Sequence, residues 1–191
     1  MPKFTRMARS CALTLVAVGA SASTLALAPA AQGVDDPTGS RPIAFAMSDA
    51  QLEKYDKSLE ARRERAAQRF ATRLRTATQT ALSQRGDAYA WGGVGPNAFD
   101  CSGLIFFSYR NAGFKVPRTS GALAAYTHRV AKQDMRRGDL MFFQSGGNVY
   151  HASIFLGFQH GRAMMVHSPG SGRSVTVAAP WTSSWFGGRV R

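Results

Sequence analysis

Cysteine and histidine are the residue types in this sequence with the clearest capacity for covalent chemistry. Cys101 stands between a glycine-rich loop and an apolar stretch with helical periodicity, and Asp100 before it is a good helix cap. Cys101 is therefore predicted to begin a helix. Unpaired N–H groups and the helix dipole stabilise negative charge at that end, so we expect a lowered pKa of the Cys101 thiol and a nucleophilic thiolate.

A thiolate nucleophile requires a nearby base, and the base requires a third group that orients it. His151 and His167 lie in two strand-like runs joined by a short turn around His160. A hairpin would bring both imidazoles onto neighbouring strands and leave His160 exposed. His128 is expected at the end of a helix over 118–128, where a cationic ring suits the helix C-terminus.

Other roles for these side chains stay open at this point. A histidine on an apolar strand is often a hydrogen-bonded structural residue. Cys101, His151 and His167 could also bind zinc, but the sequence has no paired-cysteine or His-x-x-x-His spacing and no evident fourth ligand. We therefore expect no metal and no cofactor.

The first 30 residues have the pattern of a secretory signal peptide: a basic start, an apolar run that begins at Cys11, and small residues at 28–30. A membrane anchor is disfavoured because the uninterrupted apolar stretch is short. Cleavage after Ala30 would remove Cys11, so Cys101 would have no internal disulfide partner. We expect an exported protein without stable membrane insertion after cleavage.

Glycine and proline make residues 31–47 a predicted linker. A helix is expected over 48–85, beginning at a capping box formed by Ser48 and Gln51 and ending at Gly86. Its apolar residues recur every three or four positions, and arginines crowd the remaining surface.

The composition restricts the partners. The chain has 191 residues, of which 45% are hydrophobic, and a net charge of +13, so it can form a core and is strongly basic. The arginines of an arm over 48–69 are either a solvated helix surface or a site for a polyanion. Nucleic acid is not expected, because no binding motif is present. Anionic polymers of a bacterial envelope fit an exported protein better.

Five motifs occur in a fixed order: Tyr89-x-Trp91-Gly92-Gly93, Asp100-Cys101-Ser102-Gly103-Leu104, Pro117-Arg118-Thr119-Ser120, Gly138-Asp139-Leu140-x-Phe142-Phe143 and His151-x-x-Ile154-x-Leu156-Gly157. Together they resemble the NlpC family of secreted bacterial cysteine peptidases, which are papain-like and cut peptidoglycan stem peptides. The resemblance covers roughly residues 70–191. One Asp-Cys-Ser-Gly alone would be weak evidence, whereas several motifs in register are specific.

The resemblance implies a role for each matched residue. Cys101 corresponds to the nucleophile, His151 to the general base and His167 to the polar residue that orients the base. Tyr89 corresponds to a tyrosine whose hydroxyl helps to stabilise the oxyanion. A substrate cleft would be lined by Trp91, Asp100, Ser102, Arg118 and Ser120. Without the resemblance, Asp100 could be only a helix cap and Arg118 only an ion-pair partner.

The implied fold is α+β, with a papain-like domain over 70–191 in which the nucleophile helix packs on a small antiparallel sheet. The expected helices and strands are, in order, helices over 48–85, 101–112 and 118–128 and strands near 139–144, 149–157, 162–168 and 173–178. A hairpin turn is expected over 145–148. Trp181, Trp185 and Phe186 either pack on the sheet or flank the cleft, and packing in the core is favoured.

The implied function is a secreted, cell-wall cysteine peptidase of the D-glutamyl–diamino acid endopeptidase type. An N-acetylmuramoyl-L-alanine amidase or an acyltransferase of the same catalytic class is an alternative, because these differ in the cleft and the acceptor and share the Cys–His chemistry. A non-catalytic wall-binding module is a further alternative. Ser153 stands where the family usually has glycine, which makes the substrate preference less certain.

Overall fold

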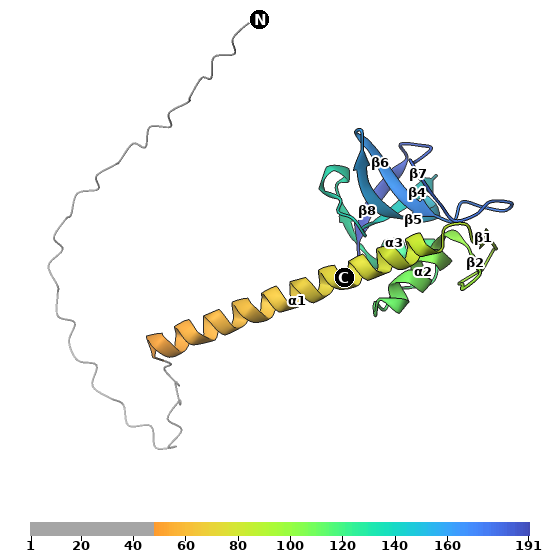
Figure 1. Cartoon of the computed structure of the whole chain (residues 1–191). Coiled ribbons are helices and arrows are strands. Elements are labelled where there is room, and N and C mark those ends of the chain that lie inside the picture. Colours follow the sequence, from red (N-terminus) through yellow and green to blue (C-terminus); the bar gives the residue numbers. More distant parts are fainter. Residues whose placement is uncertain (1–47) are drawn as a thin grey trace, which may run out of the picture. The chain divides into compact units, whose positions relative to one another are not determined.

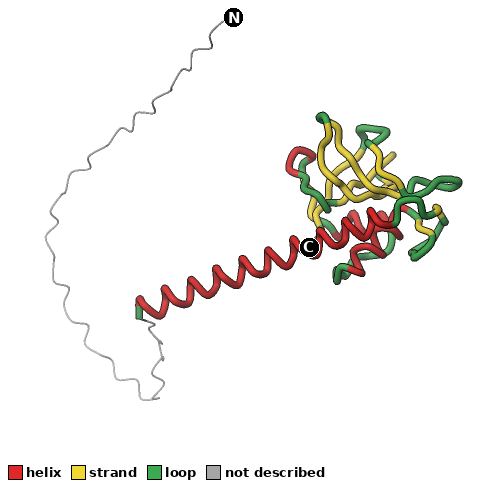
Figure 2. The backbone as a smooth tube through the Cα atoms, in the orientation of Figure 1, coloured by secondary structure: helices red, strands yellow, loops and turns green. Residues whose placement is uncertain are grey.

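The computed structural model describes residues 48–191, so the expected signal peptide and the expected linker over 31–47 lie outside the described residues. Figures 1 and 2 show helices packed beside a curved antiparallel sheet. The elements are α1 Asp49–Ser83, β1 Ala88–Tyr89, β2 Ala98–Phe99, α2 Cys101–Asn111, α3 Ser120–Tyr126, β3 His128–Val130, the 3-10 helix η1 Lys132–Asp134, β4 Leu140–Ser145, β5 Asn148–Gln159, β6 Arg162–His167, β7 Thr176–Ala178 and β8 Trp185–Arg189.

The capping box at the start of α1 is confirmed. The backbone N–H of Gln51 donates to Ser48 Oγ at 3.4 Å, and the backbone N–H of Ser48 donates to Gln51 Oε1 at 2.9 Å. The helix ends at Ser83, two residues earlier than expected, because the N–H groups of Gln84 and Arg85 bond to carbonyls only three residues back. Among the described residues, no helix combines the length and apolarity that a membrane crossing needs.

Six strands form one sheet in the order β3-β8-β4-β5-β6-β7, and every neighbouring pair is antiparallel. The expected hairpin over 145–148 is confirmed, since Ser145 pairs with Asn148. The turn around His160 joins β5 to β6, where Gln159 pairs with Arg162, and His160 is exposed as expected. These two hairpins place the strands that carry the candidate catalytic histidines side by side.

The core divides between the two faces of the sheet. Leu140, Ile154 and Val166 point toward α2 and the second half of α1, in one cluster with Leu104 and Ala77. The alternate strand residues pack on the opposite face in a second cluster that contains Met141, Phe143, Phe155, Met165 and Trp185. The expectation that the nucleophile helix packs on a small antiparallel sheet is therefore confirmed.

The expected helix over 118–128 is shorter in the structure, and His128 lies in a strand. Thr119 is the N-cap of α3, its Oγ1 accepting from the N–H of Ala122 at 3.3 Å, and the extended backbone of Thr127 ends the helix. His128 begins β3, which pairs with β8. Neither of these two strands was predicted from the sequence.

Strand β8 reads as a loop in the sequence because it contains Gly187 and Gly188. Pairing on both edges, with β3 and β4, makes it a strand. A Cβ added to Gly188 would lie 2.3 Å from Thr127 Oγ1, so glycine allows the segment that contains Thr127 to approach β8 closely. The last expected strand is also shorter than 173–178, since β7 begins at Thr176.

Candidate active site

Helix α2 begins at Cys101, as predicted, with Asp100 as its N-cap. The backbone N–H of Gly103 donates to Asp100 Oδ1 at 2.6 Å. The glycine-rich loop lies against this first turn so closely that a Cβ on Gly103 would meet the carbonyl oxygen of Gly93 at 1.8 Å. The Asp-Cys-Ser-Gly sequence therefore combines a cap, the thiol and a residue small enough to admit the loop.

The environment of Cys101 contradicts the expected lowering of its pKa. Burial, together with the negative charge of Asp100, raises the pKa of the Cys101 thiol above its ordinary value of 9.0. The N–H groups of Ala152, Ser102 and Cys101 itself act in the opposite direction by hydrogen bonding to the sulfur. The helix N-terminus thus contributes as expected, but desolvation outweighs it.

The contact with Ala152 connects α2 to the sheet. Ala152 directly follows His151 in β5, and its N–H acts to lower the pKa of the Cys101 thiol, so the sulfur lies near the histidine-bearing segment of this strand. The thiol is half-buried and not shut away in the core. Residues from the start of one helix and the middle of a distant strand therefore meet, which α2–sheet packing makes possible.

His151 and His167 form the pair that the hairpin predicted. His151 Nε2 lies 3.0 Å from His167 Nδ1, and both side chains are buried. Burial, with a smaller contribution from His167, lowers the pKa of His151 to about 3. Burial, with a smaller contribution from Arg173, lowers the pKa of His167 to about 4. Both imidazoles are therefore neutral at neutral pH, and one ring donates the shared hydrogen to the other.

A cleft of about 400 Å³ opens at Cys101. Its lining includes each of the residues that the family resemblance assigned to substrate binding, namely Trp91, Asp100, Ser102, Arg118 and Ser120. Trp91 is 90% exposed at its rim. Thr119 and Tyr150 also line the cleft and were missed. Thr119 could have been noticed inside the Pro-Arg-Thr-Ser motif, whereas no local pattern marks Tyr150.

Asp100 and Arg118 bind each other in the wall of this cleft. Arg118 donates to both carboxylate oxygens, from Nη1 at 3.0 Å and from Nη2 at 2.6 Å, and Nη1 also donates to Ser102 Oγ at 2.9 Å. Burial acts to raise the pKa of Asp100, but hydrogen bonds from Arg118, Gly103 and Gly92 lower it overall. Asp100 is therefore an ionised helix cap and an ion-pair partner as well as a cleft residue.

Tyr89 lies in β1, near the same group of side chains. Burial, with smaller electrostatic contributions from Cys101 and Asp100, raises the pKa of its hydroxyl, so Tyr89 remains a hydrogen-bond donor at neutral pH. This strand pairs with β2, which leads directly into Asp100. The pairing places the tyrosine beside the start of α2.

The family of the chain follows from a comparison with known protein families. The model of the NlpC/P60 family matches residues 86–189, more than half of the chain. The chain belongs to the NlpC/P60 family. The match begins after α1, and the expected domain start at residue 70 stays a prediction.

Similar proteins include a probable endopeptidase, Rv2190c of Mycobacterium tuberculosis, which is 43% identical over 106 residues, 56% of this chain and 26% of the relative. The peptidoglycan hydrolase RipB of the same organism has a similar structure, with a TM-score of 0.55 and 27% identity over 63% of this chain and 65% of RipB. RipD, described as a non-catalytic NlpC/p60 domain protein adapted to peptidoglycan binding, gives a TM-score of 0.52 at 28% identity, over 62% of this chain and 98% of RipD. The chain thus spans about a quarter of the length of the first of these relatives.

Trp181 of this NlpC/P60 domain lies beside the histidine pair, which corresponds to the less favoured of its two expected positions. A place in the core was favoured, but its side chain is 52% exposed. Its ring stacks on Phe143 with centroids 4.4 Å apart and lies 5.1 Å from His151 and 5.7 Å from His167. Trp181 therefore shields the histidine pair from solvent on one side. Trp185 is buried in the core as expected.

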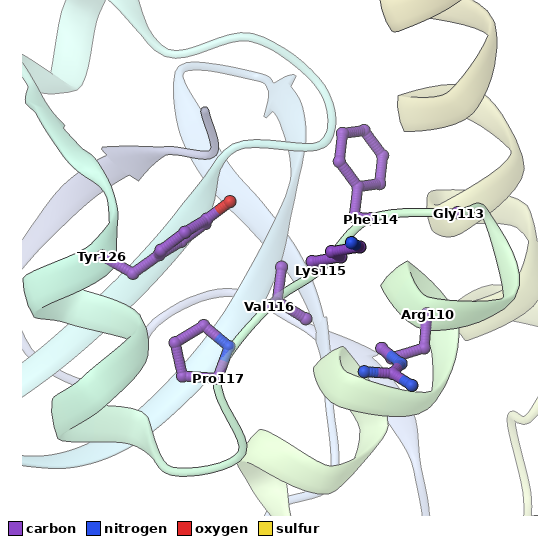
Figure 3. A pocket seen from close by; sticks show the side chains of 7 residues that line it. All are labelled: Arg110, Gly113, Phe114, Lys115, Val116, Pro117 and Tyr126. Atoms are coloured by element: carbon purple, nitrogen blue, oxygen red, sulfur yellow. The ribbon is translucent and has the colours of Figure 1, made fainter.

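Several further hollows lie outside the Cys101 cleft, and two of them flank elements of the site. One, of about 510 Å³, is lined by His167, Arg173 and Trp181 and so adjoins the histidine pair. The other, shown in Figure 3, lies between the end of α2 and α3 and is lined by side chains such as Arg110 and Tyr126, with no candidate catalytic residue. Among residues 48–191, no group of three or more His, Cys, Asp or Glu side chains is placed to hold a metal ion.

Proposed function

We propose that this NlpC/P60 protein is a cysteine-type peptidoglycan hydrolase that cuts amide bonds in stem peptides through Cys101, His151 and His167. The observation that carries the proposal is the 3.0 Å contact between His151 and His167, on the strand whose Ala152 N–H acts to lower the pKa of the half-buried Cys101 thiol. A nucleophile, a base and an orienting group are the three parts that amide hydrolysis by a thiol requires.

In the resting site the proton stays on sulfur, because the thiol pKa is raised and the pKa of His151 is lowered. His151 therefore acts as a general base, taking the thiol proton as the sulfur of Cys101 attacks the carbonyl carbon. The carbonyl oxygen becomes an oxyanion, and we assign its stabilisation to the N–H of Cys101 and the hydroxyl of Tyr89. Protonated His151 then gives its proton to the leaving amine as the C–N bond breaks.

The second half of the reaction regenerates the enzyme. The product of the first half is a thioester between Cys101 and the acyl part of the substrate. His151 removes a proton from water, the hydroxide adds to the thioester, and the proton returns to sulfur as the acid leaves. His167 holds the His151 ring in position throughout, and the hydrogen bond between them stabilises the imidazolium that forms.

The bond that we propose is cut is the one between D-glutamate and the diamino acid of the stem peptide. The ionised carboxylate of Asp100 and the hydroxyl of Ser102 line the cleft and suit the amino end of a short peptide. Mass identification of products released from defined muropeptides tests this proposal. A product cut between the muramoyl group and L-alanine would instead make the protein an amidase.

The nucleophile is tested by Cys101→Ala in a cell-wall zymogram, with circular dichroism as the measure of folding. We expect loss of lysis with an unchanged spectrum. The histidines are tested by His151→Ala, with His128→Ala as a matched control, because His128 is exposed on β3. Retained lysis in the folded Cys101 variant would exclude the proposed mechanism.

A wall-binding role without catalysis has one supporting observation, the similarity to RipD. The two roles differ in their dependence on the thiol. Alkylation of Cys101 with iodoacetamide should stop hydrolysis if the protein is an enzyme. Wall binding that survives alkylation, with no hydrolysis beforehand, would favour the binding role.

We also propose that the exposed arginines at 62, 63, 65 and 69 of α1 bind anionic wall polymers. Such contacts are screened by salt, so retention on purified walls should fall as salt rises. Retention that is unchanged between low and high salt would contradict this part of the proposal.

A further inference from the structure

The first half of α1 is a helix without a partner among the described residues. Residues 49–69 are exposed, apart from the half-buried Leu59 and Ala61, and Figure 1 shows this half extending beyond the sheet and α2. An isolated helix of this length is marginal in water, because most helical stability in proteins comes from packing of an apolar face. A partner covering one face would supply that packing.

An apolar stripe runs along this exposed half. Leu52 and Tyr55 are 45% and 52% exposed, and with Leu59 they follow the three-and-four spacing of one helix face. The same face continues into Phe70 and Ala77, which pack in the core. The second half of α1 therefore packs against the core through this face, and the first half exposes the same face to solvent.

A groove of about 1060 Å³ lies beside the second half of α1. Phe70 and Leu74 give it apolar walls. Its lining also includes four arginines from three segments of the chain: Arg75, Arg136, Arg137 and Arg189. Within residues 48–191, only Arg189 of these four forms an ion pair, with Asp139 at 2.8 Å. The groove therefore suits an occupant that is apolar on one side and acidic on its flank.

The exposed half of α1 has that character. Asp49, Glu53, Asp56 and Glu60 recur at three- and four-residue spacing, along one flank of the apolar stripe. Among the described residues, only Glu53 of these four is in an ion pair, with Lys57 at 2.6 Å. The acidic flank is at the start of the helix and the arginine-lined groove is beside its second half.

We propose that two copies of the chain pair through α1 in antiparallel orientation, each placing its acidic first half in the groove of the other. Leu52 and Tyr55 then lie against Phe70 and Leu74, and the acidic flank faces the arginines. Parallel pairing would align the two acidic segments with each other, which is repulsive, and leave both grooves empty. Two-fold symmetry fills both grooves with the same contact and closes the assembly.

The pairing leaves the proposed active site open. No residue of α1 lines the Cys101 cleft. The dimer and the hydrolase activity are therefore separate properties, and variants of α1 can be tested for pairing while cleavage of soluble muropeptides reports that the domain is folded.

Sedimentation equilibrium of the purified protein tests the pairing. We expect a dimer for the wild type, and monomers for Glu53→Arg with Asp56→Arg and for Arg136→Glu with Arg137→Glu, each weakening the dimer by at least about tenfold. An equal mixture of the two variants should restore a dimer, because the reversed charges are complementary. Lys54→Glu with Arg65→Glu is the matched control, since at about 100° per residue both side chains lie on the side of α1 that faces away from the apolar stripe, and it should remain dimeric.

The proposal would be overturned by a wild-type protein that is monomeric at about 100 µM, by a dimer that survives both reversals, or by a mixture of the two variants that stays monomeric. Loss of the dimer in the control variant would also overturn it, because the contact would then lie outside the groove.

Discussion

Acidification should destabilise this protein through its histidine pair. The pKa of His151 is lowered from 6.5 to about 3 and that of His167 to about 4, in both cases mainly by burial. Because the folded-state pKa values are below the unfolded value, the unfolded chain binds more protons between about pH 3 and pH 6.5. The stability present above this window is therefore lost as the pH falls through it.

The size of the effect follows from the same values. At about pH 4.5, His151 alone accounts for a loss of about 3 kcal/mol relative to pH 7, and His167 alone for a similar amount. The two rings share a hydrogen bond, so their contributions are not independent. We expect about 3 to 5 kcal/mol for the pair.

Urea unfolding followed by tryptophan fluorescence at about pH 7 and about pH 4.5 measures this loss. The variant carrying His151→Gln and His167→Gln keeps polar side chains that do not titrate, so it should lose about 3 to 5 kcal/mol less than the wild type. His128→Gln is the matched control for an exposed histidine and should behave as the wild type. Equal losses in the wild type and the double variant would refute the assignment of a buried neutral pair.

Three further outcomes are expected. The alkylation rate of Cys101 by iodoacetamide should rise about tenfold per pH unit from pH 6 to pH 9, because burial raises the thiol pKa above 9.0; a plateau already at pH 6 would show a preformed thiolate. Gly103→Ala should destabilise the fold by about 3 kcal/mol or more and displace Cys101, since the added Cβ would lie 1.8 Å from a backbone carbonyl oxygen. Gly121→Ala is the control and should be neutral or stabilising, because its added Cβ would have no atom within 4 Å. Thermal unfolding of the two variants measures the difference. Trp181→Ala should expose the histidine pair and shift the acid limb of the pH–rate profile upward, because desolvation is the largest cause of the lowered pKa of His151; an unshifted limb would show that Trp181 does not shield it.

Local sequence patterns predicted the elements that carry the chemistry. The cap at Asp100 placed Cys101 at the first turn of α2, and strand alternation with a short turn placed His151 and His167 on paired strands. These predictions succeeded because caps, turns and hairpins depend on residues close together in the chain. The capping box at Ser48 succeeded for the same reason.

Contacts between distant segments decided the rest. Strand β8 exists because β3 and β4 pair with its glycine-rich backbone, which no local pattern indicates. The pKa of Cys101 depends on how deeply α2 packs against β5, and this burial reversed the direction expected from the helix terminus alone. Trp181 lies over the histidines, although its apolar character favoured the core. Burial and pairing are sums over neighbours that only the folded chain brings together, whereas a helix cap or a hairpin turn is complete within a few residues.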